Sequence, residues 1–267
     1  MQGIDLSTLK SSTARALKIG ASGIDLSILK SSITRAPRIH LYGVSGIGKT
    51  TFAYQMPKPF VFDLDKSIGT LGYGDKIPHV SDVTYETMIE YLENIRDGDY
   101  DFQTIIIDTI DRLDDIVVEY TLRTNRWDKM DYAGYGNKFT VKSSYWQRIF
   151  TLLDEIWTKK NLCIVTIGHS KVVSVNEPDL PTYEKYSFAT LSKTEVSHIE
   201  NTSDIVAFVN TRKFSSYDDN KRVNISTTNE RLMFLNPSPA YIAKTRYPIP
   251  DGIPLDWNAF KTYLVRQ

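Results

Sequence analysis

The sequence predicts an α/β fold: a mostly parallel, twisted β-sheet flanked by helices, with antiparallel strands at one edge. Three observations lead to this prediction. From Ile39 onward, short apolar runs alternate with segments of helical periodicity. A glycine-rich loop, GVSGIGKT, stands between the first of these runs and the first helical segment. Residues 211–235 alternate between polar and apolar side chains, which is typical of strands with one solvated face.

Each strand of the predicted sheet is a short run of apolar residues. A run that is apolar throughout indicates a strand buried on both faces, because helices cover both sides of a parallel sheet. In chain order these strands are expected at residues 38–43, 59–65, 102–108, 162–168 and 203–210.

Helices are expected where apolar residues return every three or four positions. The clearest case is 144–160, in which Trp146, Ile149, Leu153 and Ile156 form one stripe. The other helices are expected at 49–55, 84–95, 111–122 and 191–199.

A basic arm, residues 1–37, is predicted to precede the α/β core, residues 38–267. Residues 3–19 and 23–39 agree at 12 of 17 positions, so the arm contains a tandem repeat. One pair of copies is not a solenoid, which needs at least about three repeats. The simpler interpretation is a flexible or partly helical arm; the alternative is an arm that docks on a neighbouring subunit or contacts nucleic acid.

Composition narrows the range of functions. Lysine plus arginine and aspartate plus glutamate both number 32, so the chain lacks the strongly basic balance of many nucleic-acid-binding proteins, although local patches remain open. Cys163 is the only cysteine, which excludes an intramolecular disulfide and fits a reducing cytosol. The chain contains no signal peptide and no apolar run near 18 residues, so we expect an intracellular protein without a membrane partner.

Residues 43–50 match the phosphate-binding pattern G-x-x-x-x-G-K-[ST] in full. Its glycines let backbone N–H groups turn toward the phosphates, Lys49 reaches the β- and γ-phosphates, and the Thr50 hydroxyl binds Mg²⁺. A predicted strand precedes the loop and a predicted helix follows it, as this motif requires. The residues expected to bind the nucleotide are Gly43, Ser45, Gly46, Ile47, Gly48, Lys49, Thr50 and Thr51.

Asp108 is the expected second part of the site, because it ends the apolar run 105–107. A carboxylate at the carboxyl end of a buried parallel strand faces the ligand crevice. There it can hold Mg²⁺ together with Thr50, usually through water; the alternative is an exposed aspartate in a turn. The next residue is Thr109, where remodelling ATPases of the AAA+ type usually carry a glutamate as the base.

The catalytic base must therefore come from another position, and the strand FVFDLDKS ends in two acids. We favour Asp65 as the residue that orients the attacking water, with Asp63 as the alternative; either acid could instead only cap or solvate the strand end. His169, which ends the strand in TIGHS, could sense the γ-phosphate by hydrogen bonding. A structural role is the alternative for this histidine.

The chain resembles the RecA-like ATPases, and more narrowly a bacteriophage family of small RecA-core ATPases implicated in single-strand annealing and recombination. The resemblance spans roughly residues 38–260. It lies in LYGVSGIGKTT, FVFDLDKS, TIIIDT, DYAGYGNKF with YWQRIFTLLDEI, TIGHS and AYIAKTRYPIPDGIPLDW.

This resemblance implies a RecA-like P-loop NTPase core with ATP and Mg²⁺ as cofactors, DNA-stimulated hydrolysis, and a location in the cytoplasm of a bacterial host. The implied partners are single-stranded DNA, further copies of the chain and a phage single-strand binding protein. Asp65 takes the place of the family's base, where glutamate is commoner, and His169 that of its polar sensor. Lys244 and Arg246 take the place of basic residues that complete a neighbouring subunit's site and neutralise transition-state charge; surface solvation is the alternative.

Two predicted loops combine basic and aromatic side chains, as single-strand binding grooves do. The first is 124–142, which includes Arg126, Trp127 and Lys142. The second is 170–188, which follows the proposed sensor directly, so that the nucleotide state could order or release it. For both loops the alternative is that the aromatic residues pack over the sheet.

The leading hypothesis is an ATPase that assembles on single-stranded DNA and promotes annealing or strand exchange. The alternatives are an ATP-dependent loader or remodeller of a protein, a small-molecule kinase, and a nucleotide-gated binding module with negligible turnover. Thr109 argues against the remodeller, and the lack of an arginine cluster after the central helices argues against the kinase. Aspartate in place of glutamate at position 65 keeps the binding module open.

Overall fold

The computed structural model describes residues 35–131, 137–189, 191–217 and 223–264, with the backbone alone for 213–217 and 223–227. The chain divides into two units, Met1–Arg35 and Ala36–Gln267, and all that follows concerns the second. The predicted arm lies almost wholly outside the described residues, so its boundary and its role remain predictions.

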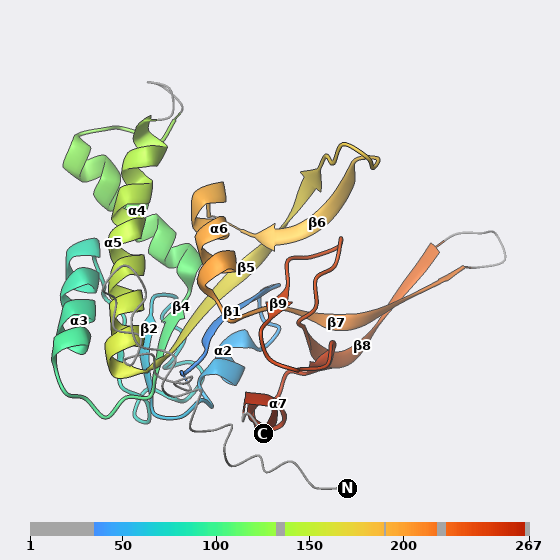
Figure 1. Cartoon of the computed structure of the whole chain (residues 1–267), viewed down its shortest axis with the longest axis horizontal. Coiled ribbons are helices and arrows are strands. Elements are labelled where there is room, and N and C mark those ends of the chain that lie inside the picture. The colour runs from blue at the N-terminus through green and yellow to red at the C-terminus, as the bar shows by residue number, and fades with distance from the viewer. Residues whose placement is uncertain (1–34, 132–136, 190, 218–222, 265–267) are drawn as a thin grey trace, which may run out of the picture. The chain divides into compact units, whose positions relative to one another are not determined.

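One mixed sheet organises the second unit, and its parallel strands occupy the centre (Figure 1). The mutually parallel strands are β1 (Arg38–Gly43), β2 (Pro59–Asp63), β3 (His79–Val80), β4 (Thr104–Asp108), β5 (Cys163–Val175) and β7 (Ile205–Tyr217). The antiparallel additions are β6 (Tyr183–Phe188), β8 (Val223–Phe234), β9 (Lys244–Thr245) and β10 (Ile253–Pro254). The order across the sheet is β10-β8-β7-β1-β5-β4-β2-β3, with β6 beside β5 and β9 beside β7.

The order of the central strands fixes the type of fold. Strand β5 lies between β1, which leads into the phosphate loop, and β4, which ends in Asp108. The parallel core β7-β1-β5-β4-β2 is that of an α/β P-loop fold, and the antiparallel strands β8 and β10 extend one edge, as the sequence predicts.

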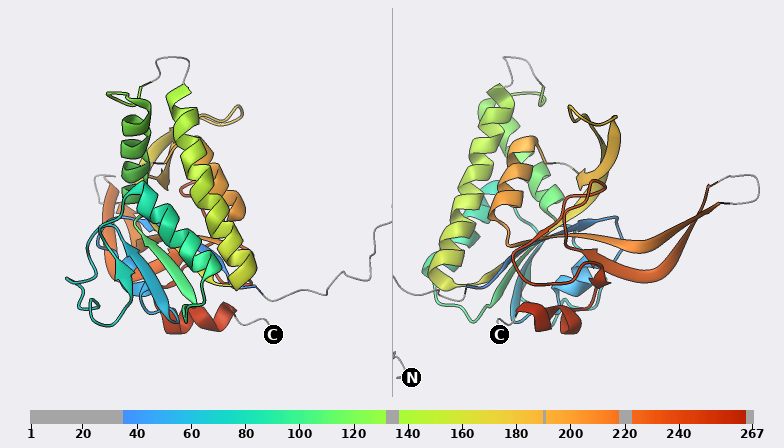
Figure 2. Two further views of the ribbon diagram at one scale, coloured as in Figure 1. Left: turned by 90° about the vertical axis from the view of Figure 1, so that its left-hand side faces the viewer. Right: turned by 45° about the vertical axis from the view of Figure 1, so that its right-hand side comes forward.

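Helices cover both faces of the sheet (Figure 2). On one face lie α3 (Tyr85–Asp97), α4 (Ile110–Asn125), α5 (Asn137–Lys160) and α6 (Lys193–Thr202), and on the other lie α2 (Lys49–Ala53) and α7 (Trp257–Leu264). The stripe predicted for residues 144–160 is the buried face of α5, where Trp146, Ile149 and Ile156 are almost inaccessible to solvent. None of the helices in the described ranges has the length and apolar character needed to cross a bilayer.

Strand β4 illustrates why the central strands are apolar throughout. Successive side chains of a strand point to opposite faces of the sheet. Ile105 and Ile107 pack with the helices α3, α4 and α5, whereas Ile106 packs with α2 and α7. All three are at most 1% exposed, so every position of this strand has to be apolar until the strand reaches the ligand edge at Asp108.

Helix α5 begins at Asn137, seven residues before the predicted start, because a buried ion pair holds its first turns. The Lys142 Nζ donates a hydrogen bond to the Asp114 Oδ1 on α4 over 2.6 Å, and the Trp146 Nε1 donates to the same oxygen over 2.7 Å. Burial raises the pKa of Asp114, and the lysine opposes this rise. Lys142 is 4% exposed, so the prediction that it belongs to a DNA-binding loop is wrong.

The segment 170–188 is a β-ribbon and not the loop that we predicted. Strand β5 runs on past the sheet to Val175 and pairs antiparallel with β6 (Figure 1). Tyr186 stacks on Phe208 at a centroid distance of 4.8 Å, and Phe188 is 1% exposed. These two aromatic side chains pack over the sheet, as the alternative interpretation proposed, and are not available to stack on bases.

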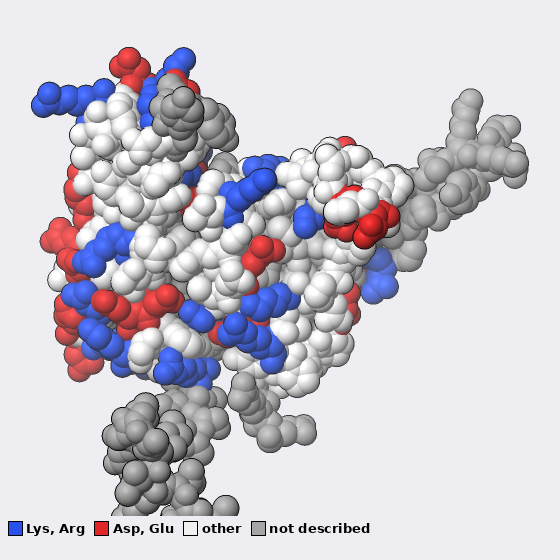
Figure 3. Space-filling view, turned by 45° about the horizontal axis from the view of Figure 1, so that its top comes forward, with Lys and Arg blue, Asp and Glu red and all other residues white. Residues whose placement is uncertain are grey.

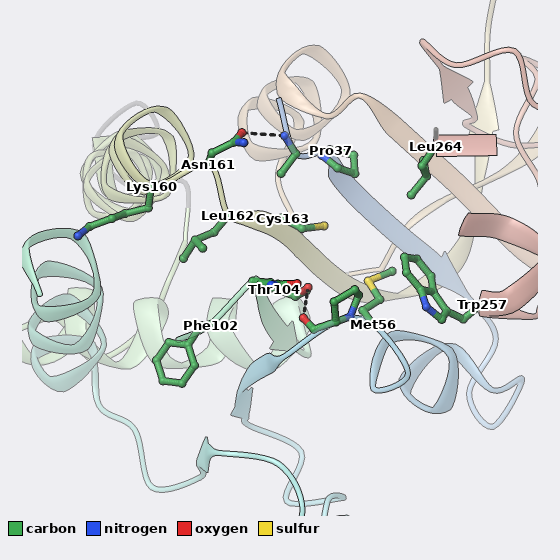
Figure 4. Close-up of a pocket in the computed structure, with 13 residues that line it drawn as sticks. Pro37, Met56, Phe102, Thr104, Lys160, Asn161, Leu162, Cys163, Trp257 and Leu264 are labelled. Atoms are coloured by element: carbon green, nitrogen blue, oxygen red, sulfur yellow. Dashed lines mark hydrogen bonds between the residues drawn. The ribbon is translucent and has the colours of Figure 1, made fainter. Parts of the chain in front are cut away.

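A pocket lies at the opposite edge of the sheet from the phosphate loop, near the amino ends of β4 and β5 (Figure 4). Its volume is about 370 Å³, and Thr104, Cys163 and Trp257 are among the residues that line it. Burial raises the pKa of the Cys163 thiol to about 12, so this thiol stays protonated and unreactive at neutral pH.

Gly43 provides a test of the close approach between β1 and β7. A Cβ atom at this position would lie 2.1 Å from the backbone oxygen of Val209, which cannot move without displacing the strand. We expect Gly43→Ala to lower the free energy of unfolding by roughly 1–3 kcal/mol, measured by urea denaturation. Gly69→Ala is the control, because a Cβ there would meet nothing within 4 Å. Equal stability of the two variants would contradict this account of the strand contact.

Candidate nucleotide-binding site

The predicted site residues meet at the carboxyl ends of the parallel strands. In the strand register Gly43 of β1 pairs with His169 of β5, and Asp63 of β2 pairs with Asp108 of β4. Four polar or loop-forming positions from four different strands therefore lie along one edge of the sheet, where an open α/β sheet binds its ligand.

The loop between β1 and α2 has the conformation that its glycines permit. Gly46 and Gly48 have φ angles of 73° and 104°, a region that residues with a Cβ seldom occupy. Gly48 is the residue that precedes the first turn of α2. Ile47 is buried in the cluster below the loop, whereas Ser45 and Gly46 are exposed to a ligand. The loop is therefore anchored at Ile47 and open above it.

Lys49 folds back over the loop. Its Nζ donates hydrogen bonds to the Gly43 and Val44 carbonyl oxygens over 3.0 and 2.9 Å, and its side chain is nearly buried. Burial lowers the pKa of Lys49 to about 8, while the carboxylates of Asp108 and Asp111 oppose that change. The ammonium group is thus charged at neutral pH but poorly solvated, which prepares it to exchange the two carbonyls for phosphate oxygens.

The carboxylate of Asp108 is buried beneath the loop. The Tyr54 hydroxyl donates to its Oδ2 over 3.2 Å, while Oδ1 is buried without a hydrogen-bond partner in the described structure. Burial raises the pKa of Asp108 to about 6, and the hydroxyls of Thr50 and Tyr54 moderate the increase. A buried carboxylate oxygen without a partner, next to a threonine hydroxyl, is a set of hard oxygen ligands suited to Mg²⁺.

The rest of a magnesium coordination sphere would have to come from the ligand. No cluster of three or more His, Cys, Asp or Glu side chains that could hold a metal occurs among the described residues. Mg²⁺ usually takes one or two protein oxygens and completes its octahedron with phosphate oxygens and water. Thr50 and Asp108 therefore fit a cation that enters together with a nucleotide.

The two candidate bases have different surroundings. Both oxygens of Asp63 are engaged: Oδ1 accepts from the Ser67 backbone N–H over 2.8 Å and Oδ2 accepts from the Ile68 N–H over 3.2 Å. Asp63 is 1% exposed and closes the turn after β2. Asp65 is partly exposed, and it accepts from the Arg112 Nε over 3.2 Å. The geometry thus supports Asp65, and not Asp63, as the acid that can reach a water molecule.

His169 has a partner that the sequence analysis missed. Its Nδ1 lies 3.0 Å from the Asp111 Oδ2, and its backbone N–H donates to the same oxygen over 2.7 Å. Asp111 lies three residues after Asp108, in the first turn of α4, and is 8% exposed. An acid three residues after the end of a buried strand lies near the same edge of the sheet as the strand end. This spacing is the sequence signal that could have identified Asp111.

Lys244 and Arg246 do not reach the phosphate loop of their own chain. Lys244 pairs with Val206 in the amino-terminal part of β7, whereas the loop lies at the level of Val209. The Lys244 Nζ donates to the Glu200 carbonyl over 2.7 Å, and the Arg246 Nη1 lies 2.8 Å from the Asp204 Oδ1. Within the chain these two cations stabilise the carboxyl end of α6, where cations are favourable.

Comparisons with known proteins identify the family of the chain and one solved structure that is similar to it. Residues 35–247 match the model of a family described as AAA domain (AAA_24). The chain belongs to this family. No curated protein matches the chain. A solved structure similar to it is the crystal structure of the RadB recombinase, at 12% sequence identity and a TM-score of 0.44, with 85% of this chain and 89% of that chain covered.

Membership of the AAA domain family makes the chain a P-loop ATPase. It also changes the interpretation of Thr109. We expected Thr109, in place of the glutamate usual in remodelling ATPases of the AAA+ type, to argue against a protein remodeller; the chain nonetheless matches an AAA domain family across this segment. In the structure the Thr109 side chain caps α4 by accepting a hydrogen bond from the Arg112 backbone N–H. Thr109 therefore has a local structural role and does not exclude the class.

The raised pKa of Asp108 leads to a test on the protein without ligands. Between pH 4 and pH 6 the folded state retains a proton that the unfolded chain has lost, because the pKa rises from 3.8 to about 6 on folding. Above pH 6 the buried carboxylate is ionised and destabilises the fold. We expect Asp108→Asn to raise the free energy of unfolding by roughly 1–3 kcal/mol at pH 7.5 and to have little effect near pH 4.

Urea denaturation at the two pH values, without magnesium or nucleotide, measures this difference. Asp65→Asn is the matched control, since Asp65 is more exposed and should give no comparable gain. An Asp108→Asn protein less stable than the wild type at pH 7.5 would contradict the proposed cost of burial.

Proposed function

We propose that the protein binds ATP and Mg²⁺ at Gly43–Thr51, hydrolyses ATP, and couples hydrolysis to action on single-stranded DNA. The observation that carries the proposal is the meeting of a phosphate loop, a buried carboxylate with a free oxygen and a partly exposed second acid at one sheet edge. We further propose phage recombination or annealing in a bacterial host as the setting, with a phage single-strand binding protein as a further partner. The support for that setting is the sequence resemblance alone.

The loop residues would bind and orient the phosphates. Lys49 would exchange its two carbonyl partners for β- and γ-phosphate oxygens, and the exposed backbone at Ser45 and Gly46 would donate N–H groups. A magnesium ion held by Thr50 and Asp108 would neutralise charge on the β- and γ-phosphates.

Asp65 would orient the attacking water. Its backbone N–H donates to the Asp108 carbonyl over 3.1 Å, so the distance between the two acids is fixed by the end of the sheet. Arg112 holds one of its oxygens and leaves the carboxylate partly exposed. An acid held in this way can accept a hydrogen bond from water beside the γ-phosphate, although its shorter side chain places it farther back than a glutamate would be.

His169 would report the nucleotide state to the β5–β6 ribbon. With Nδ1 facing Asp111, the neutral ring carries its proton on Nδ1, so Nε2 can donate to a phosphate oxygen only in the protonated ring. The first residue pair of the β5–β6 ribbon is Ser170 with Phe188, directly after His169 in the chain. The His169 carbonyl accepts a hydrogen bond from the Ala189 N–H over 2.9 Å. A shift of His169 would therefore move the base of the ribbon.

The face shown in Figure 3 fits local contact with DNA better than extended contact. Basic and acidic side chains are intermixed on the face shown in Figure 3. Lys138 pairs with Asp131 over 3.0 Å and lies above the Trp127 ring, so this part of the first segment is partly neutralised. On the ribbon, Lys171 and Val172 are exposed. The aromatic residues at positions 132 and 135 lie outside the described residues, and their contact with bases remains a prediction.

Membership of the AAA domain family favours a second candidate, an ATP-dependent loader or remodeller of a protein partner. The intermixed surface charge fits a protein partner as well as it fits DNA. The two candidates share the ATP site and differ in what stimulates turnover.

ATP hydrolysis with and without single-stranded DNA separates these candidates. We expect single-stranded DNA to raise the rate several-fold, and Lys49→Ala to abolish turnover in both conditions because the phosphates lose their main cation. Robust turnover that is indifferent to single-stranded DNA, duplex DNA and RNA would reject the DNA proposal and favour the protein partner. Binding of ATP without turnover would favour the nucleotide-gated binding module.

We also propose that Lys244 and Arg246 complete the site of an adjacent subunit. To do so they would have to exchange their contacts with α6 and Asp204 for phosphate oxygens, and Arg246 is about half exposed. We expect Arg246→Ala to bind ATP normally but to hydrolyse it at least tenfold more slowly. Mixing it with Lys49→Ala should restore part of the turnover, because some interfaces then pair an intact loop with an intact Arg246.

The mixing experiment can also reject a role for Arg246 in an adjacent subunit. If the mixture stays inactive and Arg246→Ala melts at a lower temperature than the wild type, the residue serves only to anchor α6 within its own chain.

A further inference from the structure

Arg231 of β8 lies against the phosphate loop, although it is distant from the loop in sequence. A Cβ atom on Gly48 would lie 3.0 Å from the Arg231 Nη1 and 3.8 Å from its Cδ. The guanidinium group therefore sits directly beside the glycine that precedes Lys49. No sequence pattern connects residue 231 with the loop.

The sheet register explains how Arg231 reaches the loop. Gly43, the last residue of β1, pairs with Val209 of β7, and Val209 pairs with Met233 of β8. Because β8 runs antiparallel to β7, Arg231 stands opposite Thr211, two residues beyond the end of β1. Its side chain thus projects beyond the carboxyl end of the strand that carries the loop.

The face of the sheet is also determined. Side chains two apart in a strand point to the same face. Met233 is fully buried with Phe52 and Ala53 of α2, so Arg231 projects toward that face as well. The Arg231 carbonyl accepts a hydrogen bond from the Leu255 N–H over 2.9 Å, which fixes the backbone at this point.

The guanidinium group is free to bind a ligand. Arg231 is exposed, and its side chain makes no hydrogen bond or ion pair in the part of the chain that the structure describes. The neighbouring Arg212, in the same hairpin, instead pairs with Glu230 over 3.0 Å. An unpaired arginine beside a phosphate loop offers several N–H donors in a fixed fork, which suits phosphate oxygens.

We propose that Arg231 binds, within its own chain, the phosphates nearest the nucleoside of the bound nucleotide. This inference rests on the proposed nucleotide binding and adds a residue that the motif lacks. The position in the sheet identifies the phosphates concerned. His169 of β5, Asp108 of β4 and Asp65 just after β2 would surround the γ-phosphate, and these three strands lie on one side of β1. Arg231 comes from β8, on the other side.

Titration calorimetry of the full chain with Mg²⁺ and either ATP or ADP tests the proposal. We expect Arg231→Gln to weaken the binding of both nucleotides by a similar factor of about tenfold or more, because it removes a charge-assisted contact that both nucleotides make. Arg231→Lys should lose less affinity, since it keeps the charge but not the fork. Arg212→Gln is the matched control and should bind both nucleotides as the wild type does.

Melting temperatures without nucleotide should be the same for the wild type, Arg231→Gln and Arg212→Gln, which separates lost binding from lost folding. Unchanged affinity of Arg231→Gln for both nucleotides would overturn the proposal. A loss for ATP alone would also overturn it, because the contact would then be with the γ-phosphate. If the wild type bound neither nucleotide, the proposed function itself would be rejected. If the wild type and Arg231→Gln bound the nucleotides equally well, only the role of Arg231 would be rejected.

Discussion

The candidate site depends on the burial of one carboxylate, that of Asp108, at the carboxyl end of β4. Asp108 is 1% exposed, and its Oδ1 has no hydrogen-bond partner in the described structure. Burial of a charge without full compensation costs free energy. The buried charge therefore lowers the free energy of unfolding of the protein without ligand. A cation bound to the carboxylate would offset this cost.

The carboxyl end of β4 also fixes the positions of the neighbouring candidate residues. The Asp108 carbonyl accepts from the backbone N–H groups of Leu64 and Asp65, and this pair of bonds sets the path of the chain after β2. Asp63 turns inward and closes that path, which leaves Asp65 as the partly exposed acid. Asp111, in the first turn of α4, holds His169 within β5. Hydrogen bonds to the end of β4 and to α4 thus fix the positions of Asp65 and His169.

Two antiparallel ribbons leave the sheet on either side of the phosphate loop, and each carries a residue that faces it. The β5–β6 ribbon begins immediately after His169, and the β7–β8 ribbon carries Arg231 against Gly48. A nucleotide that contacts both residues would link the two ribbons through the loop. This arrangement suits an ATPase whose output surfaces lie away from the sheet, whether the partner is DNA or protein.

The sequence by itself determined the fold class, the phosphate loop and the position of Asp108, because these depend on local patterns: apolar runs, glycine spacing and a strand-terminal acid. It identified the edge strands but not the length of the ribbons, and it misplaced Lys142, whose burial depends on Asp114 in another helix. It proposed both Asp63 and Asp65, and only the hydrogen bonds of the turn distinguish them. Arg231 could be connected with the loop only by the tertiary structure, because strand register, and not sequence distance, brings it there. The spacing of Asp111 after Asp108 is a sequence signal for the same edge of the sheet, but only the structure identifies His169 as its partner.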